Sequence, residues 1–88
     1  MSALPGVLKI FVTTGCRGCK RALELAEWVR DVEPRLEVQV KDLSVEPNAG
    51  GNLVFAVPTY VYGDQAIFLG NPSPRELRTW LDSLDLEV

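Results

Sequence analysis

Two cysteines placed three positions apart, Cys16 and Cys19, constrain the fold of this chain more than any other feature. A strand-like run, residues 7–12, precedes them, and a helix-like run, residues 20–32, follows. At such a strand-to-helix junction one sulfur lies near the positive end of the helix dipole, where a thiolate is favoured. The second sulfur then lies one turn later on the same helix face. This arrangement suits reversible disulfide chemistry.

The composition indicates one globular domain, residues 1–88, because the chain has only 88 residues. Hydrophobic residues make up 47% of the chain, charged residues 24%, and the net charge is −3. No basic stripe is visible, which argues against nucleic-acid binding. Histidine is absent, so the commonest general base and zinc ligand are missing. Any chemistry must come from thiols, carboxylates, lysine or hydroxyl groups.

The first residues, 1–6, show neither a positive segment nor a long apolar stretch, so no secretory signal is predicted. No apolar run approaches the ~20 residues that cross a bilayer. We therefore expect a cytoplasmic protein that does not associate with membranes. In that compartment two closely spaced cysteines indicate a redox-active or metal-binding pair rather than a structural bridge.

Periodicity predicts a β-α-β unit in the first half of the chain. Residues 7–12 form a buried strand, a helix runs from about Cys16 to Asp31, and residues 36–41 alternate as a half-buried strand. A crossover through a helix makes the two strands parallel. The predicted apolar stripe of the helix comprises Cys19, Ala22, Leu23, Ala26 and Val29, widened by Leu25 and Trp28.

The second half of the sequence predicts two strands followed by a helix. Residues 43–53 are rich in breakers, with a short helical turn around 52–56. Residues 59–62 and 65–69 are strands joined by a tight turn, which makes an antiparallel hairpin. Residues 73–76, Ser-Pro-Arg-Glu, combine an N-cap serine, a proline at the first position and a capping-box glutamate. The apolar face of this last helix is Leu77, Trp80, Leu81 and Leu84.

This element order, with Cys-x-x-Cys after the first strand and Val57-Pro58-Thr59 before the third, resembles the thioredoxin superfamily, and within it small glutaredoxin-like proteins. The resemblance covers about residues 7–85. It implies an α/β thioredoxin-like fold with a four-stranded mixed sheet, order 2-1-3-4, flanked by helices, and with the family's second helix reduced or absent. It also implies that Cys16 is the attacking thiol, Cys19 the resolving thiol, and the Val57–Pro58 bond cis beside them.

Substrate binding is expected at Arg17, Val57 and Pro58. Arg17 either has a role at the site, tuning Cys16 or meeting an acidic target, or is an ordinary solvated arginine. Proline has no backbone N–H to donate, so Pro58 suits the first residue of a strand. A cis bond would turn the backbone of Val57 toward the cysteines, where an extended substrate segment can pair as an added strand.

These features predict a thiol–disulfide oxidoreductase that cycles Cys16 and Cys19 through a mixed disulfide, with no bound metal or cofactor. Its substrate would be a disulfide-bearing protein or a small thiol compound, and its electron donor would be a reductase or glutathione. The protein itself is expected to be a monomer. Two alternatives stay open: a glutathione-linked glutaredoxin, and a non-catalytic binding module or metal or cluster scaffold. Zinc needs four ligands, so two thiolates require a second chain or external ligands.

Overall fold

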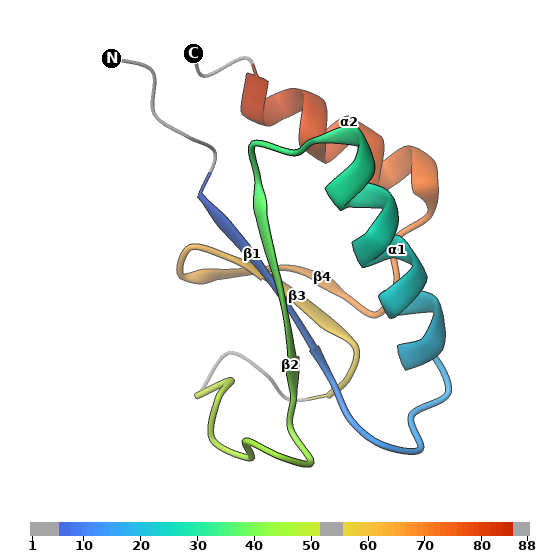
Figure 1. The fold of residues 1–88 in the computed structure, drawn as a ribbon, viewed down its shortest axis with the longest axis vertical. Coiled ribbons are helices and arrows are strands. Elements are labelled where there is room, and N and C mark those ends of the chain that lie inside the picture. Colours follow the sequence, from blue (N-terminus) through green and yellow to red (C-terminus); the bar gives the residue numbers. More distant parts are fainter. Residues whose placement is uncertain (1–5, 52–55, 86–88) are drawn as a thin grey trace.

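The computed structural model describes residues 6–51 and 56–85, and its elements follow the predicted order. They are β1 (Val7–Val12), α1 (Cys19–Val32), β2 (Glu37–Asp42), β3 (Thr59–Tyr62), β4 (Gln65–Leu69) and α2 (Pro74–Asp85). β1 lies between β2 and β3 in the sheet, and Figure 1 shows α1 and α2 on the same side of it.

The four strands form one mixed sheet in the order β2-β1-β3-β4, which confirms the predicted topology. β1 pairs with β2 in parallel and with β3 antiparallel, and β3 pairs antiparallel with β4. Parallel neighbours need a long crossover, and α1 supplies it between β1 and β2. The carboxyl end of β1 therefore leads directly into the Cys-x-x-Cys turn.

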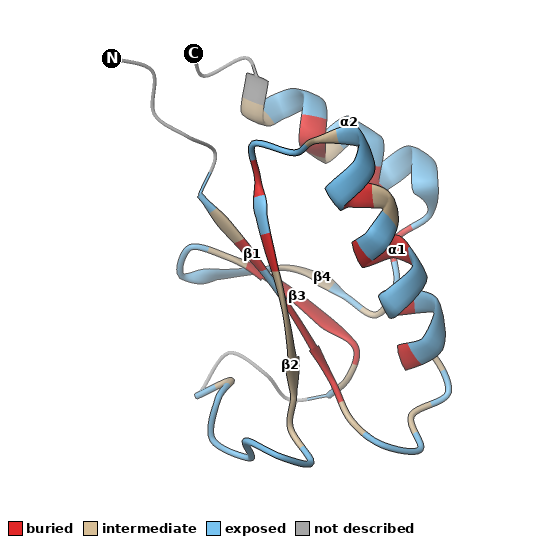
Figure 2. Ribbon diagram, viewed as in Figure 1, coloured by how far each residue is buried: buried red, intermediate tan, exposed pale blue. Residues whose placement is uncertain are grey.

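The main core lies between the sheet and the two helices. Alternate residues of β1, Leu8, Ile10 and Val12, point to this side, since side chains alternate along a strand. The helices contribute Ala22, Leu25, Ala26, Val29, Leu77 and Leu81. Figure 2 shows these buried positions on the sides of α1 and α2 that face the sheet. Phe11 and Val61 are also buried but lie outside this cluster, at strand positions that face the other way.

Helix α1 departs from the prediction in two respects. It begins at Cys19 rather than Cys16, because Arg17 and Gly18 form a turn and Gly18 is the N-cap. The placement of Leu23 in the apolar stripe was wrong, since this side chain is 46% exposed. Leu23 lies about 100° around the helix beyond the buried Ala22, outside the arc that meets the sheet.

The link between β2 and β3 is made of turns over residues 43–51, as the breakers predicted. The helical turn expected around 52–56 falls mostly outside the described residues. The capping box of α2 is confirmed: the Ser73 N–H donates to Glu76 Oε1 at 2.8 Å, and the Glu76 N–H donates to Ser73 Oγ at 3.1 Å. Over 6–51 and 56–85, no helix has the length and apolarity needed to cross a bilayer.

Candidate redox site

Cys16 and Cys19 are joined by a disulfide, with their Cα atoms 5.3 Å apart. Cys16 lies ahead of α1 and is partly exposed, whereas Cys19 is the first residue of the helix and only 6% exposed. An incoming sulfur can therefore reach Cys16 more readily than Cys19. This asymmetry fits one thiol that reacts with substrate and one that acts only from within the protein.

The loop that carries Cys16 is anchored to the segment after β2. Ser44 Oγ lies 2.7 Å from Thr13 Oγ1 and accepts a hydrogen bond from the Thr14 N–H at 2.9 Å. Ser44 is itself held, because its N–H donates to Asp42 Oδ1 at 2.8 Å. Gly15 follows with φ at +78°, a conformation that side chains disfavour, and it turns the chain toward Cys16.

Pro58 lies directly against the Cys-x-x-Cys turn. The Val57–Pro58 peptide bond is cis, and Pro58 is buried just before β3. A Cβ atom on Gly18 would lie 3.3 Å from Pro58 Cδ, so a side chain at this position would press on the proline ring. The Pro58 carbonyl accepts a hydrogen bond from the Gly70 N–H at 2.8 Å, which fixes the proline to the end of β4.

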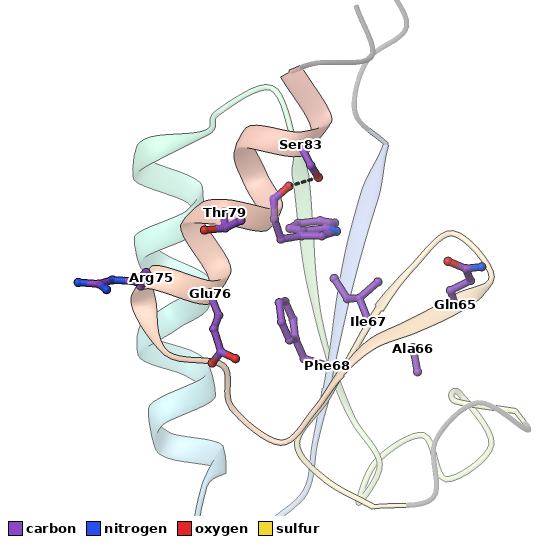
Figure 3. A pocket seen from close by; sticks show the side chains of 9 residues that line it. Gln65, Ala66, Ile67, Phe68, Arg75, Glu76, Thr79 and Ser83 are labelled. Carbon is purple, nitrogen blue, oxygen red and sulfur yellow. Dashed lines mark hydrogen bonds between the residues drawn. The ribbon is translucent and has the colours of Figure 1, made fainter.

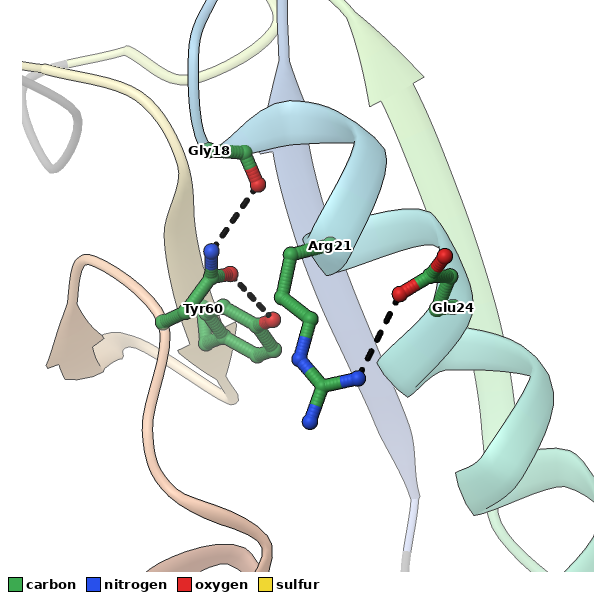
Figure 4. Close-up of polar contacts among 5 residues, drawn as sticks. Gly18, Arg21, Glu24 and Tyr60 are labelled. Carbon is green, nitrogen blue, oxygen red and sulfur yellow. Dashed lines mark hydrogen bonds and ion pairs between the residues drawn. The ribbon is translucent and has the colours of Figure 1, made fainter.

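Two residues that sequence reasoning did not assign to the site join the turn to the sheet (Figure 4). Asn71 Nδ2 donates to the Gly18 carbonyl at 2.9 Å, and the Tyr60 hydroxyl donates to Asn71 Oδ1 at 2.9 Å. Asn71 follows Gly18 by 53 positions, so no local spacing signals the contact. The carbonyl of Gly18 also accepts the Ala22 N–H at 3.0 Å, within the first turn of α1.

The charges around the turn are positive. Arg17, Lys20 and Arg21 are exposed at the start of α1, and the first helical turn contains no acidic residue. Arg21 forms an ion pair with Glu24 at 3.3 Å, both side chains being about half exposed. Cations at a helix N-terminus oppose the helix dipole, but together with it they favour a nearby thiolate. This charge arrangement therefore favours thiol ionisation at some cost to the helix.

Burial raises the pKa of Tyr60 from 10.0 to about 12, and the charge of Arg21 opposes this only in part. Between pH 10 and 12 the unfolded chain therefore ionises this tyrosine while the native protein does not, so stability should fall as pH rises. The loss should reach about 2 kcal/mol. Urea unfolding of the oxidised protein from pH 8 to 12 measures it. In Tyr60→Phe the free energy of unfolding should lack this part of its decline with pH. An identical decline in the parent and the variant would contradict the raised pKa of Tyr60.

Arg17 and Val57, the other two residues predicted for the site, lie in or near the turn, and no hydrogen bond between their side chains and the turn is described. Arg17 is exposed in the turn itself, and Val57 is half-buried and packs against the core. Within the described residues, no three His, Cys, Asp or Glu side chains gather as a candidate metal group. Cys16 and Cys19 alone supply two of the four ligands of a tetrahedral site.

An open groove of about 760 Å³ lies between β4 and α2 (Figure 3). Ile67, Phe68 and Trp80 contribute apolar lining, and Arg75 and Glu76 are its charged lining residues. Among the residues that the structure describes, none that lines the groove belongs to the Cys-x-x-Cys turn or to the segment of Pro58. The groove is therefore separate from the candidate redox site.

Comparison with known proteins agrees with this geometry. A family model described as a thioredoxin domain matches residues 7–82. The match begins with β1 and ends within α2, so it includes the cysteines, Pro58 and all four strands. A search of curated proteins finds no match.

Proposed function

The chain belongs to the thioredoxin-domain family, and on that premise we propose that it is a thiol–disulfide oxidoreductase that uses Cys16 and Cys19. One observation carries the proposal: a partly exposed Cys16 is bonded to a buried Cys19 at the N-terminus of α1, with Pro58 packed against the turn between them. A bridge that only stabilised the fold would not need an accessible sulfur beside a helix N-terminus.

The reaction proceeds in two exchanges. In the reduced protein the Cys16 thiolate attacks a substrate disulfide, so a bond from Cys16 to substrate forms and the substrate S–S bond breaks. The departing substrate thiolate takes a proton from solvent. Deprotonated Cys19 then attacks Cys16 Sγ, which forms the Cys16–Cys19 bond and releases the second substrate thiol. Two electrons pass to the substrate, and the protein is left oxidised.

Substrate is held, on this proposal, by the residues around the turn. Pro58 is buried and sets the backbone direction of Val57, with which an extended substrate segment pairs as an added strand. Arg17 is exposed beside Cys16 and provides a positive charge for an acidic group on the substrate. The substrate is a disulfide-bearing protein or a small disulfide, and the protein works as a cytoplasmic monomer with no resident cofactor.

The electron donor that restores the reduced form is a reductase or glutathione. Insulin reduction with a dithiol donor tests the basic activity, and hydroxyethyl disulfide turnover with glutathione and its reductase tests glutathione use. We expect activity in the first assay, and Cys16→Ser should remove it. A Cys16→Ser protein that reduces insulin at the parent rate would refute the proposal. Redox inactivity together with bound iron or zinc would instead support a cluster or metal scaffold.

A further inference from the structure

We propose that Asn71 is a positioning residue for the Cys16–Cys19 pair and that it acts through the carbonyl of Gly18. Asn71 lies just after β4, yet its side chain reaches the turn between the cysteines (Figure 4). Within the described part of the chain, Asn71 is the residue whose side chain donates a hydrogen bond to the backbone of this turn. The proposal gives Asn71 no contact with substrate.

The Gly18 carbonyl determines where Cys19 lies. This oxygen accepts the Ala22 N–H of the first helical turn, and the peptide group it belongs to links Gly18 to Cys19. A second donor, Asn71 Nδ2 at 2.9 Å, fixes the direction of the same peptide group. Because Cys19 follows this peptide directly, the hydrogen bond restrains the position of its sulfur relative to Cys16.

Asn71 and Pro58 both crowd the position that a side chain on Gly18 would take, which limits how this turn can move. A Cβ on Gly18 would lie 3.0 Å from Asn71 Nδ2 and 3.3 Å from Pro58 Cδ. The asparagine amide and the proline ring therefore both pack close to this point of the turn. Loss of the amide removes the hydrogen bond to Gly18 and leaves Pro58 as the remaining close neighbour.

The Gly18 carbonyl fixes which end of the Asn71 amide faces the turn, and Tyr60 holds the other end. A carbonyl oxygen accepts but does not donate, so the amide nitrogen of Asn71 must face Gly18. The amide oxygen is then left for the Tyr60 hydroxyl, which donates to it at 2.9 Å. Tyr60 is fully buried in β3, so its hydroxyl ties Asn71 to the sheet.

The hydrogen bond from Asn71 should affect how readily the Cys16–Cys19 disulfide forms, and its role in turnover rests on the proposed function. A restrained turn raises the effective concentration of Cys19 at Cys16 and so favours the closed disulfide. Loss of one such hydrogen bond should lower the equilibrium constant for ring closure about fivefold, which raises the reduction potential by about 20 mV. The mixed disulfide should also resolve more slowly.

Three variants test this inference, each equilibrated as purified protein in glutathione redox buffers. Asn71→Ala should show the fivefold shift, and Tyr60→Phe, which retains its ring packing, should shift the potential in the same direction by less. The double variant should shift no further than Asn71→Ala, because both changes break one chain of hydrogen bonds. Ser73→Ala is the matched control, since it removes the α2 cap without touching the turn and should leave the potential unchanged.

The outcome that would overturn the inference is an unchanged potential in Asn71→Ala and Tyr60→Phe while both lose stability as Ser73→Ala does. Asn71 would then be a structural residue only. The readout needs no substrate, so it separates this inference from the proposed function. If the parent protein fails to reduce insulin but the potential of Asn71→Ala still rises, the oxidoreductase proposal fails and the positioning role stands.

Discussion

Replacing Cys19 with serine should stop the reaction at the mixed disulfide and reduce turnover about a thousandfold or more. The first exchange needs only Cys16, which is partly exposed, but release of the substrate needs the second thiol. An intramolecular thiol acts at an effective concentration far above that of a free thiol, so external rescue is slow. Mass spectrometry after mixing Cys19→Ser with a small disulfide should detect a stable adduct on Cys16.

Cys16→Ser is the matched control for this trap. Its only remaining thiol, Cys19, is 6% exposed, so substrate should form little or no adduct with it. Equal adduct formation on both variants would contradict the assignment of Cys16 as the reacting sulfur. Faster adduct formation on Cys19 would reverse the two roles.

Leu25→Ala should destabilise the protein by about 3 kcal/mol, within the usual 2–5 kcal/mol for a leucine removed from a core. Leu25 is 3% exposed and packs in the cluster between α1 and the sheet. A domain of this size has a total stability of about 4–13 kcal/mol, so the change should shift the urea midpoint strongly.

Leu23→Ala in the same helix is the control for this measurement. Leu23 is 46% exposed, and the substitution should change stability by less than about 0.5 kcal/mol. Because both residues are leucines two positions apart in α1, helix propensity cancels in the comparison. Equal losses in the two variants would show that the buried face of α1 is not the one described.

Much of the fold followed from local pattern. Strand β2, the two-residue turn between β3 and β4 and the capping box of α2 were predicted from neighbouring residues, and each is present. The parallel pairing of β1 with β2 follows from the intervening helix. The full strand order came from the family resemblance, because periodicity alone does not place β3 beside β1.

What the sequence missed depends on contacts between distant segments. The start of α1 moved to Cys19 because Gly18 packs against Pro58 and Asn71, neither of which is a neighbour in sequence. Leu23 was misassigned because its spacing from Cys19 suits a helix face, whereas the edge of the buried arc depends on how α1 packs on the sheet. Ser44, which follows β2, likewise holds the loop before Cys16 through a hydrogen bond from the Thr14 N–H. No sequence motif predicts this contact.

The reduction potential of the Cys16–Cys19 pair tests the central claim most directly. The oxidised protein is equilibrated in buffers of defined potential, and the free thiols are counted after acid quenching. A reversible redox pair should titrate between about −270 and −180 mV, the interval spanned by thioredoxin-type and isomerase-type dithiols. A potential below about −300 mV, typical of structural disulfides, would contradict the account.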